Sequence, residues 1–174
     1  DLEKISIVQT GNAETVFTTS QDSLNAIAKI SGLEENTKQV LEGIKEQISA
    51  EQVQSISIQS SLQVFEVKSI DSGKSAFVSK ISMSFTAEEN LENVNILQVI
   101  PKSVAQNVAE VTFSGEQPIV LQSDPVVQWS FESVAKGETK DISYTVKKKV
   151  DSLDATTVAV AKEQLVEEQP MYDY

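Results

Sequence analysis

The sequence predicts a mainly β protein, of α+β class overall, whose largest part is an antiparallel β-sandwich. Between residues 54 and 148, apolar and polar residues alternate in roughly seven or eight short runs, which turn-forming residues separate. Between residues 20 and 48, the apolar residues repeat at helical spacing instead. Because the predicted strands follow one another without helices between them, a sandwich is favoured over a parallel α/β fold.

The clearest alternation lies in two runs around the only Trp of the chain. Pro125 begins the first run, and Gly137 turns the chain into the second. One phase of the two runs is apolar and consists of Val127, Trp129, Phe131, Ile142, Tyr144 and Val146. Exposed rings would offer a ligand an aromatic platform, but the shared phase predicts that Trp129 and Tyr144 are buried in the core.

The first 52 residues predict a small α+β subdomain, made of a hairpin and two helices. Residues 5–8 and 15–18 are predicted strands, and the turn residues Gly11 and Asn12 between them predict the hairpin. Helical spacing follows. The predicted apolar stripes are Leu24, Ile27, Ala28 and Ile30 on the first helix, and Val40, Leu41, Ile44 and Ile48 on the second.

Both predicted helices have capping residues. Ser20 or Asp22 can cap the first helix, and Asn36 can cap the second. Gly43 lies inside the second helix, where a glycine costs about 1 kcal/mol relative to alanine. Two explanations stay open for this residue: close packing against a neighbouring element, and a tolerated exposed glycine.

The predicted sandwich occupies residues 53–150. Within it the alternation changes phase after Val64, which predicts a bulge or a strand break. A further strand at residues 156–161 is expected to return to the N-terminal hairpin and helices, so that the sandwich lies between two halves of the subdomain. Residues 163–174 are acidic, contain a proline and predict a linker or tail.

The charged residues are strongly biased. The 174 residues include 26 acidic and 14 basic ones, the net charge is −12, and every basic residue is Lys. Without Arg there is no bidentate clamp for phosphate, and the acidic excess disfavours nucleic acid and anionic lipid. Without His and Cys there is no imidazole base, no thiolate nucleophile and no ligand of either type for a metal.

These exclusions predict a protein that is not an enzyme, with no catalytic, cofactor-binding or metal-binding residues and no cofactor. Paired carboxylates remain the main catalytic alternative, because any two acidic side chains can converge in a fold. No spacing in the sequence favours a particular pair.

Four groups of residues have a functional interpretation beside a structural one. Asp124, next to a proline, is predicted to accept turn hydrogen bonds rather than to act in catalysis. Residues 147–149, all Lys, are predicted to be a solvated strand end rather than a lipid contact. Lys80 lies on the polar phase of its strand, whereas an isopeptide bond needs an inward-facing lysine. A solvated surface loop is favoured over a calcium site for Glu88, Glu89, Asn90, Glu92 and Asn93.

Part of the chain resembles a known type of domain. The elements are the strand end Val99-Ile100-Pro101-Lys102-Ser103, the segment Asp124-Pro125-Val126-Val127-Gln128-Trp129, and the turn Lys136-Gly137-Glu138 before residues 142–146. Their order resembles the immunoglobulin-like repeat domains of archaeal and bacterial surface proteins, particularly uncharacterised membrane-anchored archaeal proteins. The resemblance covers roughly residues 54–148 and implies an immunoglobulin-like sandwich at the cell surface, but it implies no particular activity.

We therefore expect a structural or interaction module of a surface protein, located outside the cytoplasm. Because the first residue is Asp1 rather than Met, we expect a processed chain or a fragment, anchored through segments outside these residues. The expected partner is another protein or a second copy of the chain, with no nucleic acid and no direct membrane binding. The alternative is a ligand-binding sensor, which an apolar pocket between the helical part and the sandwich would favour.

Overall fold

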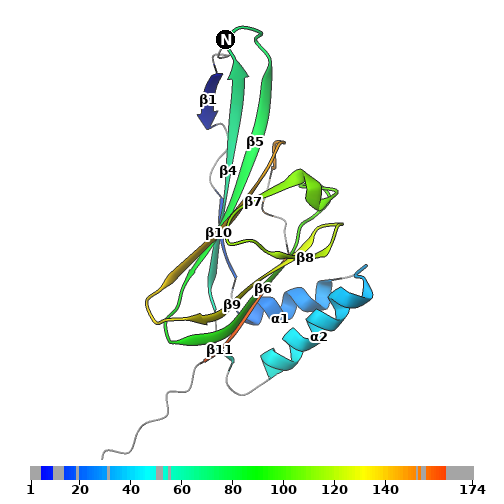
Figure 1. The fold of residues 1–174 in the computed structure, drawn as a ribbon, viewed down its shortest axis with the longest axis vertical. Coiled ribbons are helices and arrows are strands. Elements are labelled where there is room, and N and C mark those ends of the chain that lie inside the picture. The colour runs from blue at the N-terminus through cyan, green and yellow to red at the C-terminus, as the bar shows by residue number, and fades with distance from the viewer. Residues whose placement is uncertain are drawn as a thin grey trace, which may run out of the picture.

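The protein consists of two antiparallel sheets that pack face to face, with two helices on the outer face of one sheet (Figure 1). It is therefore mainly β, and the predicted sandwich is confirmed. The structure is a computed structural model, which describes residues 5–9, 14–18, 20–30, 32–49, 53–54, 56–151, 153 and 156–163.

The first sheet, sheet A, has the strand order β1-β4-β5-β10-β7, and β2 also pairs with β4. Its strands are β1 (Ile5–Gln9), β2 (Glu14–Thr18), β4 (Ile58–Ser69), β5 (Ser75–Thr86), β7 (Val111–Gly115) and β10 (Thr139–Val146). The second sheet, sheet B, has the order β3-β11-β6-β9-β8. Its strands are β3 (Val53–Gln54), β6 (Leu91–Val99), β8 (Ile119–Gln122), β9 (Val126–Val134) and β11 (Thr156–Glu163).

The strands predicted from alternation correspond to β4 to β10, and the predicted late strand corresponds to β11. The reason is that burying one face of a strand imposes a period of two on its apolar residues. In β10, for example, Ile142, Tyr144 and Val146 are buried, while Ser143 and Thr145 between them are more exposed.

The core between the sheets is centred on the two predicted aromatic residues. Trp129 and Tyr144 are each 1% exposed, so neither ring is available as a surface platform. The Phe113 ring joins them, with its centroid 6.0 Å from that of Trp129 and 5.9 Å from that of Tyr144. The Trp129 indole N–H donates to the carbonyl of Glu116 at 3.2 Å, which satisfies its polar atom.

Burial raises the pKa of the Tyr144 hydroxyl above its ordinary value of about 10. The folded state therefore keeps this group neutral at pH values where the unfolded chain ionises it. We expect the burial of the neutral Tyr144 hydroxyl to stabilise the fold fully below about pH 10. This stabilisation should be lost as the pH rises further.

The Tyr144→Phe variant should therefore lose less free energy of unfolding at alkaline pH than the wild type. Unfolding free energies of both proteins at about pH 8 and about pH 10.5, measured by urea denaturation, test the expectation. An identical loss of stability in the two proteins would show that Tyr144 does not titrate in this way.

Part of sheet B, chiefly β6 and β11, is buried on both faces, because the helices form a second core against it. Ile96 packs between the sheets and the next residue, Leu97, packs toward the helices, and both are fully buried. In β11 the run from Val158 to Ala161 is buried without interruption, as expected of a strand covered on both faces.

The helices are α1 (Ser20–Lys29) and α2 (Glu35–Ser49), and both pack on sheet B. Two polar contacts fix α2 at its ends. The buried side-chain carbonyl of Gln122 accepts from the Glu34 N–H at 2.8 Å, and the Gln47 side chain donates to the carbonyl of Asn93 at 2.9 Å. Sequence reasoning did not find these contacts, because their partners are far apart in the chain.

The predicted helix stripes are partly confirmed. Ile27, Ile30, Val40, Leu41 and Ile44 pack in the second core, as predicted. On α1, however, Ala26 takes part in that core, while Leu24 and Ala28 are exposed, so the packed face is rotated from the predicted one. The side chain of Ile48 lies outside the described residues.

Gly43 is exposed, and a Cβ atom built on it would have no neighbour within 4 Å. Close packing therefore does not explain this glycine. The other explanation applies: Gly43 is an exposed glycine that the helix tolerates.

The predicted N-terminal hairpin is wrong. β1 and β2 do not pair with each other but follow one another along the same edge of β4. Ile5 to Gln9 face Ser69 to Phe65, and Glu14 to Thr18 face Leu62 to Ile58. Because β4 is long, it offers pairing sites to both strands in turn. The predicted turn residues Gly11 and Asn12 lie outside the described residues.

The predicted return of β11 is confirmed for the helices and wrong for the hairpin. β11 packs against α1 and α2, but its hydrogen-bonded neighbours in sheet B are β3 and β6. The described strands of the first 52 residues, β1 and β2, thus belong to sheet A, whereas the helices pack on sheet B. The division of the chain into domains at residue 52 stays a prediction.

The ends of β4 and β5 project beyond the rest of the sandwich as an arm, residues 65–78 (Figure 1). β10 pairs with β5 only from Ser79 to Thr86, so the arm has no third strand on that side. β4 is continuous and pairs with β5 without a shift of register, so the bulge or strand break predicted near Val64 is wrong. The phase of the apolar residues changes there because the strand leaves the core, and Phe65 and Val67 are half-buried on the arm.

No helix in the described part of the chain is long and apolar enough to cross a membrane.

Candidate interaction surfaces

Asp124 lies in the turn between β8 and β9. Its carboxylate is 3.6 Å from the Lys102 ammonium, and both side chains are at least half exposed. An exposed ion pair of this kind contributes about 0–1 kcal/mol. Asp124 thus forms an ion pair and not the predicted turn hydrogen bonds. The reason is that the loop after β6 places Lys102 beside it.

The acidic group after β5 is divided between a loop and a strand. Glu88 and Glu89 are exposed in the loop, whereas Glu92 and Asn93 belong to β6. The side-chain oxygen of Asn90 accepts from the Lys136 N–H at 2.9 Å, so it already holds the neighbouring turn. Within the described residues no three acidic, His or Cys side chains gather in a way that could hold a metal ion.

The three lysines at residues 147–149 follow β10 and are exposed. A buried serine holds their backbone: the Ser79 hydroxyl donates to the Lys148 carbonyl at 2.7 Å and accepts from the Val150 N–H at 2.9 Å. The Lys149 ammonium lies 5.7 Å from the centre of the Phe77 ring. The lysine side chains are thus solvated, and their backbone is anchored to β5.

Ser79 has a structural role that sequence reasoning missed. The available signal was a serine on the inward phase of β5, between Phe77 and Ile81. An inward-facing hydroxyl needs a hydrogen-bond partner, but the sequence does not say which loop provides it.

Lys80 lies opposite Gln63 and Thr145 in sheet A. Its neighbours in the strand, Ser79 and Ile81, are buried in the core, so alternation directs Lys80 to the outer face. This is the polar position predicted from the sequence.

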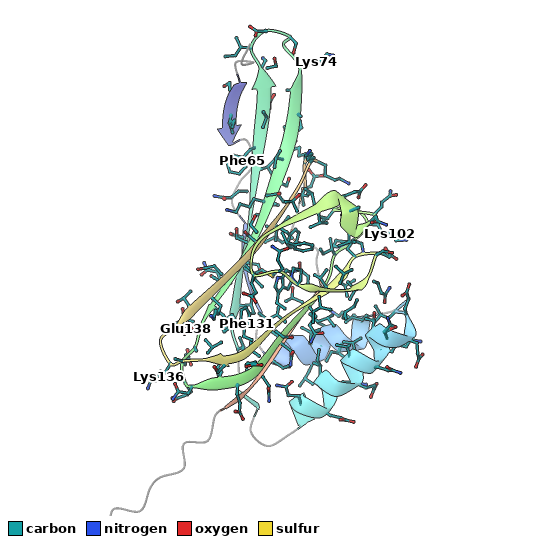
Figure 2. The ribbon with its side chains drawn as sticks, in the orientation of Figure 1. Phe65, Lys74, Lys102, Phe131, Lys136 and Glu138 are labelled. Carbon is teal, nitrogen blue, oxygen red and sulfur yellow. The ribbon has the colours of Figure 1, made fainter. Side chains whose placement is uncertain are left out.

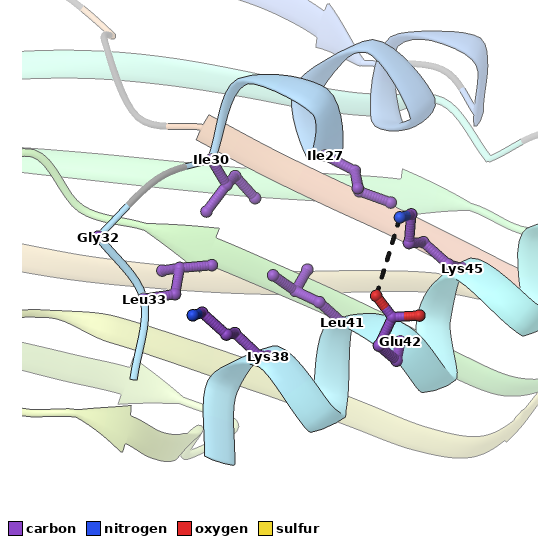
Figure 3. Close-up of a pocket in the computed structure, with 8 residues that line it drawn as sticks. All are labelled: Ile27, Ile30, Gly32, Leu33, Lys38, Leu41, Glu42 and Lys45. Carbon is purple, nitrogen blue, oxygen red and sulfur yellow. Dashed lines mark ion pairs between the residues drawn. The ribbon is translucent and has the colours of Figure 1, made fainter. Parts of the chain in front are cut away.

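A small pocket lies between the two helices (Figure 3). Its volume is about 200 Å³, and its apolar part consists of Ile27, Ile30, Leu33 and Leu41. Three charged side chains, Lys38, Glu42 and Lys45, line its rim, and the Glu42 carboxylate is 3.8 Å from the Lys45 ammonium. Pockets that hold small molecules usually have volumes of about 300–1,000 Å³, so this one is small for such a ligand.

A larger hollow lies at the base of the arm, and we name it the basic groove. It has a volume of about 610 Å³ and is lined by Val78, Val104, Ala109, Lys147 and Lys148, among others. Glu110 also lines it, but that carboxylate accepts from the N–H groups of Gln106 at 2.7 Å and Asn107 at 3.4 Å. The lining of the groove therefore combines apolar side chains with two lysines and a carboxylate that backbone N–H groups hold.

No protein family matches this chain, and no curated protein or solved structure shows significant similarity to it.

Proposed function

We propose that this chain is a structural or interaction module without catalytic activity, and that it belongs to the exterior of a membrane-anchored surface protein. In this proposal the sandwich is immunoglobulin-like, as the resemblance of residues 54–148 implies. The module presents its surface and sheet edges to a protein partner or to a second copy, and it binds neither nucleic acid nor the membrane directly.

The observation that carries the proposal is the filling of both packing interfaces. Apolar side chains occupy the space between the two sheets and also the space between sheet B and the helices. Among the residues considered for a calcium site, Asn90 is engaged in a hydrogen bond that holds the neighbouring turn. A body whose packing interfaces are filled suits a spacer or a docking module better than a sensor.

A ligand-binding sensor remains the alternative, and the pocket between the helices is what favours it. Its four aliphatic side chains and Lys38 suit a small amphiphilic anion. A set of such compounds that raises the melting temperature of the wild type, but not of a pocket-filling Leu33→Trp variant, would favour the sensor. Equal or absent shifts in both proteins would favour the module.

Surface labelling tests the proposed location. Intact cells that express the full-length protein are treated with a membrane-impermeant amine reagent, which reaches exposed lysines such as Lys102 (73% side-chain exposure). We expect labelling of this protein before the cells are permeabilised, with a cytoplasmic protein as the unlabelled control. Labelling that requires permeabilisation would contradict the proposal.

A further inference from the structure

Two neighbouring strands of sheet A, β5 and β10, lead into loops of different charge at the two ends of the pair. β5 runs from the arm to the loop that contains Glu88 and Glu89, a length of about 40 Å for its 12 residues at roughly 3.3 Å each. β10 pairs with it antiparallel, begins after Glu138 and ends before Lys147. The pairing therefore places Glu88, Glu89 and Glu138 at one end of the strand pair, together with Lys136 and Lys140, and places Lys147 and Lys148 at the other end.

The acidic end is a pair of loops fixed to each other, which we name the acidic loops (residues 87–90 and 135–138). The Ala87 N–H donates to the Glu138 carbonyl at 3.0 Å, and the Gly137 N–H donates to the Ala87 carbonyl at 2.7 Å. The Glu138 carboxylate pairs with Lys140 at 2.9 Å. The exposed carboxylates of Glu88 and Glu89 have no ion-pair partner among the described residues.

The basic end is the basic groove at the foot of the arm. Its two lysines, Lys147 and Lys148, are exposed and have no ion-pair partner in the described part of the chain. The Ser79 hydrogen bonds fix the backbone that carries them. Figure 2 shows the arm, with Lys74 at its tip, and the turn of Lys136 and Glu138 at opposite ends of the protein.

The two ends also differ in shape. The acidic loops connect strand ends, whereas the basic groove is a hollow of about 610 Å³ with Val78 and Val104 in its lining. The exposed carboxylates of Glu88 and Glu89 complement the two ammonium groups of the hollow in charge, because backbone N–H groups hold the Glu110 carboxylate there.

We infer that the acidic loops of one copy of this chain dock in the basic groove of a second copy. This inference rests on the proposed function and names the partner of the module. Because the two surfaces are different and lie at opposite ends, the contact is heterologous, and a dimer keeps one free surface of each kind. Association therefore continues into a linear array along the direction of β5 and β10.

The array is weak and sensitive to salt. Exposed ion pairs contribute little individually, and the net charge of −12 makes copies repel one another over long distances. At an ionic strength of about 0.15 M the screening length is about 8 Å, which suppresses the long-range repulsion more than the contact itself. Tethering on a shared support raises the effective concentration to the mM range, where a weak contact is populated.

Two charge-reversal variants of the whole chain test this arrangement. The groove variant is Lys147→Glu with Lys148→Glu, and the loop variant is Glu88→Lys with Glu89→Lys. In sedimentation experiments at about 0.1–1 mM protein and about 0.15 M salt, we expect the average mass of the wild type to rise continuously with concentration. About 1 M salt should abolish that rise, and each variant alone should stay monomeric.

The decisive sample is an equimolar mixture of the two variants. The acidic loops of the groove variant meet the lysines in the groove of the loop variant, and the reversed loops of the loop variant meet the reversed groove of the groove variant. Both contacts pair opposite charges, so the average mass of the mixture should again rise with concentration. A matched control, Lys29→Glu with Lys38→Glu on the helices, changes the net charge as the groove variant does and should associate like the wild type.

Three outcomes would overturn the inference: a monomeric wild type at every salt concentration, a wild type that stops at a dimer, and a mixture that stays monomeric. Binding of the monomeric wild type to phosphatidylserine vesicles, lost in the groove variant, would assign the groove to lipid and also overturn it. Surface labelling tests the proposed location separately. A failure of self-association therefore leaves that part of the proposed function standing.

Discussion

Replacement of Trp129 by alanine is expected to lower the free energy of unfolding by about 3–5 kcal/mol. Trp129 is 1% exposed and contacts the Phe113 ring edge-on, so its removal leaves a cavity between the two sheets. Its indole hydrogen bond to the Glu116 carbonyl is lost as well. Urea denaturation followed by circular dichroism measures the change.

The control for this variant is Ile119→Ala. Ile119 lies on the neighbouring strand β8 and is 58% exposed, so its truncation should change stability by no more than about 0.5 kcal/mol. A change below about 1 kcal/mol for Trp129→Ala, or wild-type tryptophan fluorescence typical of an exposed indole, would contradict the assignment of Trp129 to the core.

Replacement of Leu97 by alanine is expected to cost about 2–5 kcal/mol, as much as replacement of its neighbour Ile96. The two residues are adjacent in β6 and fully buried, but Ile96 faces sheet A and Leu97 faces the helices. If the helices unfold together with the sandwich, both variants should shift a single denaturation transition. Circular dichroism reports the helices, and Trp129 fluorescence reports the sandwich.

Leu24→Ala on α1 is the control, because Leu24 is 42% exposed and lies outside the second core. Two separate transitions, with Leu97→Ala shifting only the transition of the helices, would show that the helices form an independent unit. Coincident transitions would show that residues 20–49 are part of the sandwich's cooperative fold.

The strands of the sandwich could be predicted because each buries one face. Val127 and Trp129 in β9, and Ile142 and Tyr144 in β10, alternate with more exposed residues, and this period is visible without any structure. The predicted burial of the aromatic pair follows from the same period. The strand predicted at residues 156–161 is also present, as β11.

The partners of the strands could not be predicted in the same way. Alternation of apolar and polar residues indicates that a strand has a buried face. Its pairing partner, however, depends on which strand edge is free elsewhere in the fold. A turn signal between β1 and β2 therefore suggested a hairpin, whereas β4 pairs with both. The uninterrupted burial of Val158 to Ala161 likewise has its cause in helices that lie more than 100 residues earlier in the chain.

The candidate surfaces show the same limit. The residues at 88–89 and at 147–148 were visible as charged groups in the sequence, and each was predicted to be solvated. The relative position of the two charged groups depends on the register of β5 and β10. In this register Val146 faces Ser79 and Thr139 faces Thr86. That register places the two groups at opposite ends of one pair of strands.

The sequence alone determined the fold class, the strand positions, the buried aromatic pair and the exclusion of chemistry that needs Arg, His or Cys. These properties depend on local periodicity and on side-chain type, which the sequence contains in full. The tertiary structure alone decided the pairing of β1 and β2 with β4, the second core under the helices, the arm, and the opposition of the acidic loops to the basic groove. These properties depend on contacts between distant segments, which form only where backbone hydrogen bonding and apolar burial are satisfied for the whole chain together.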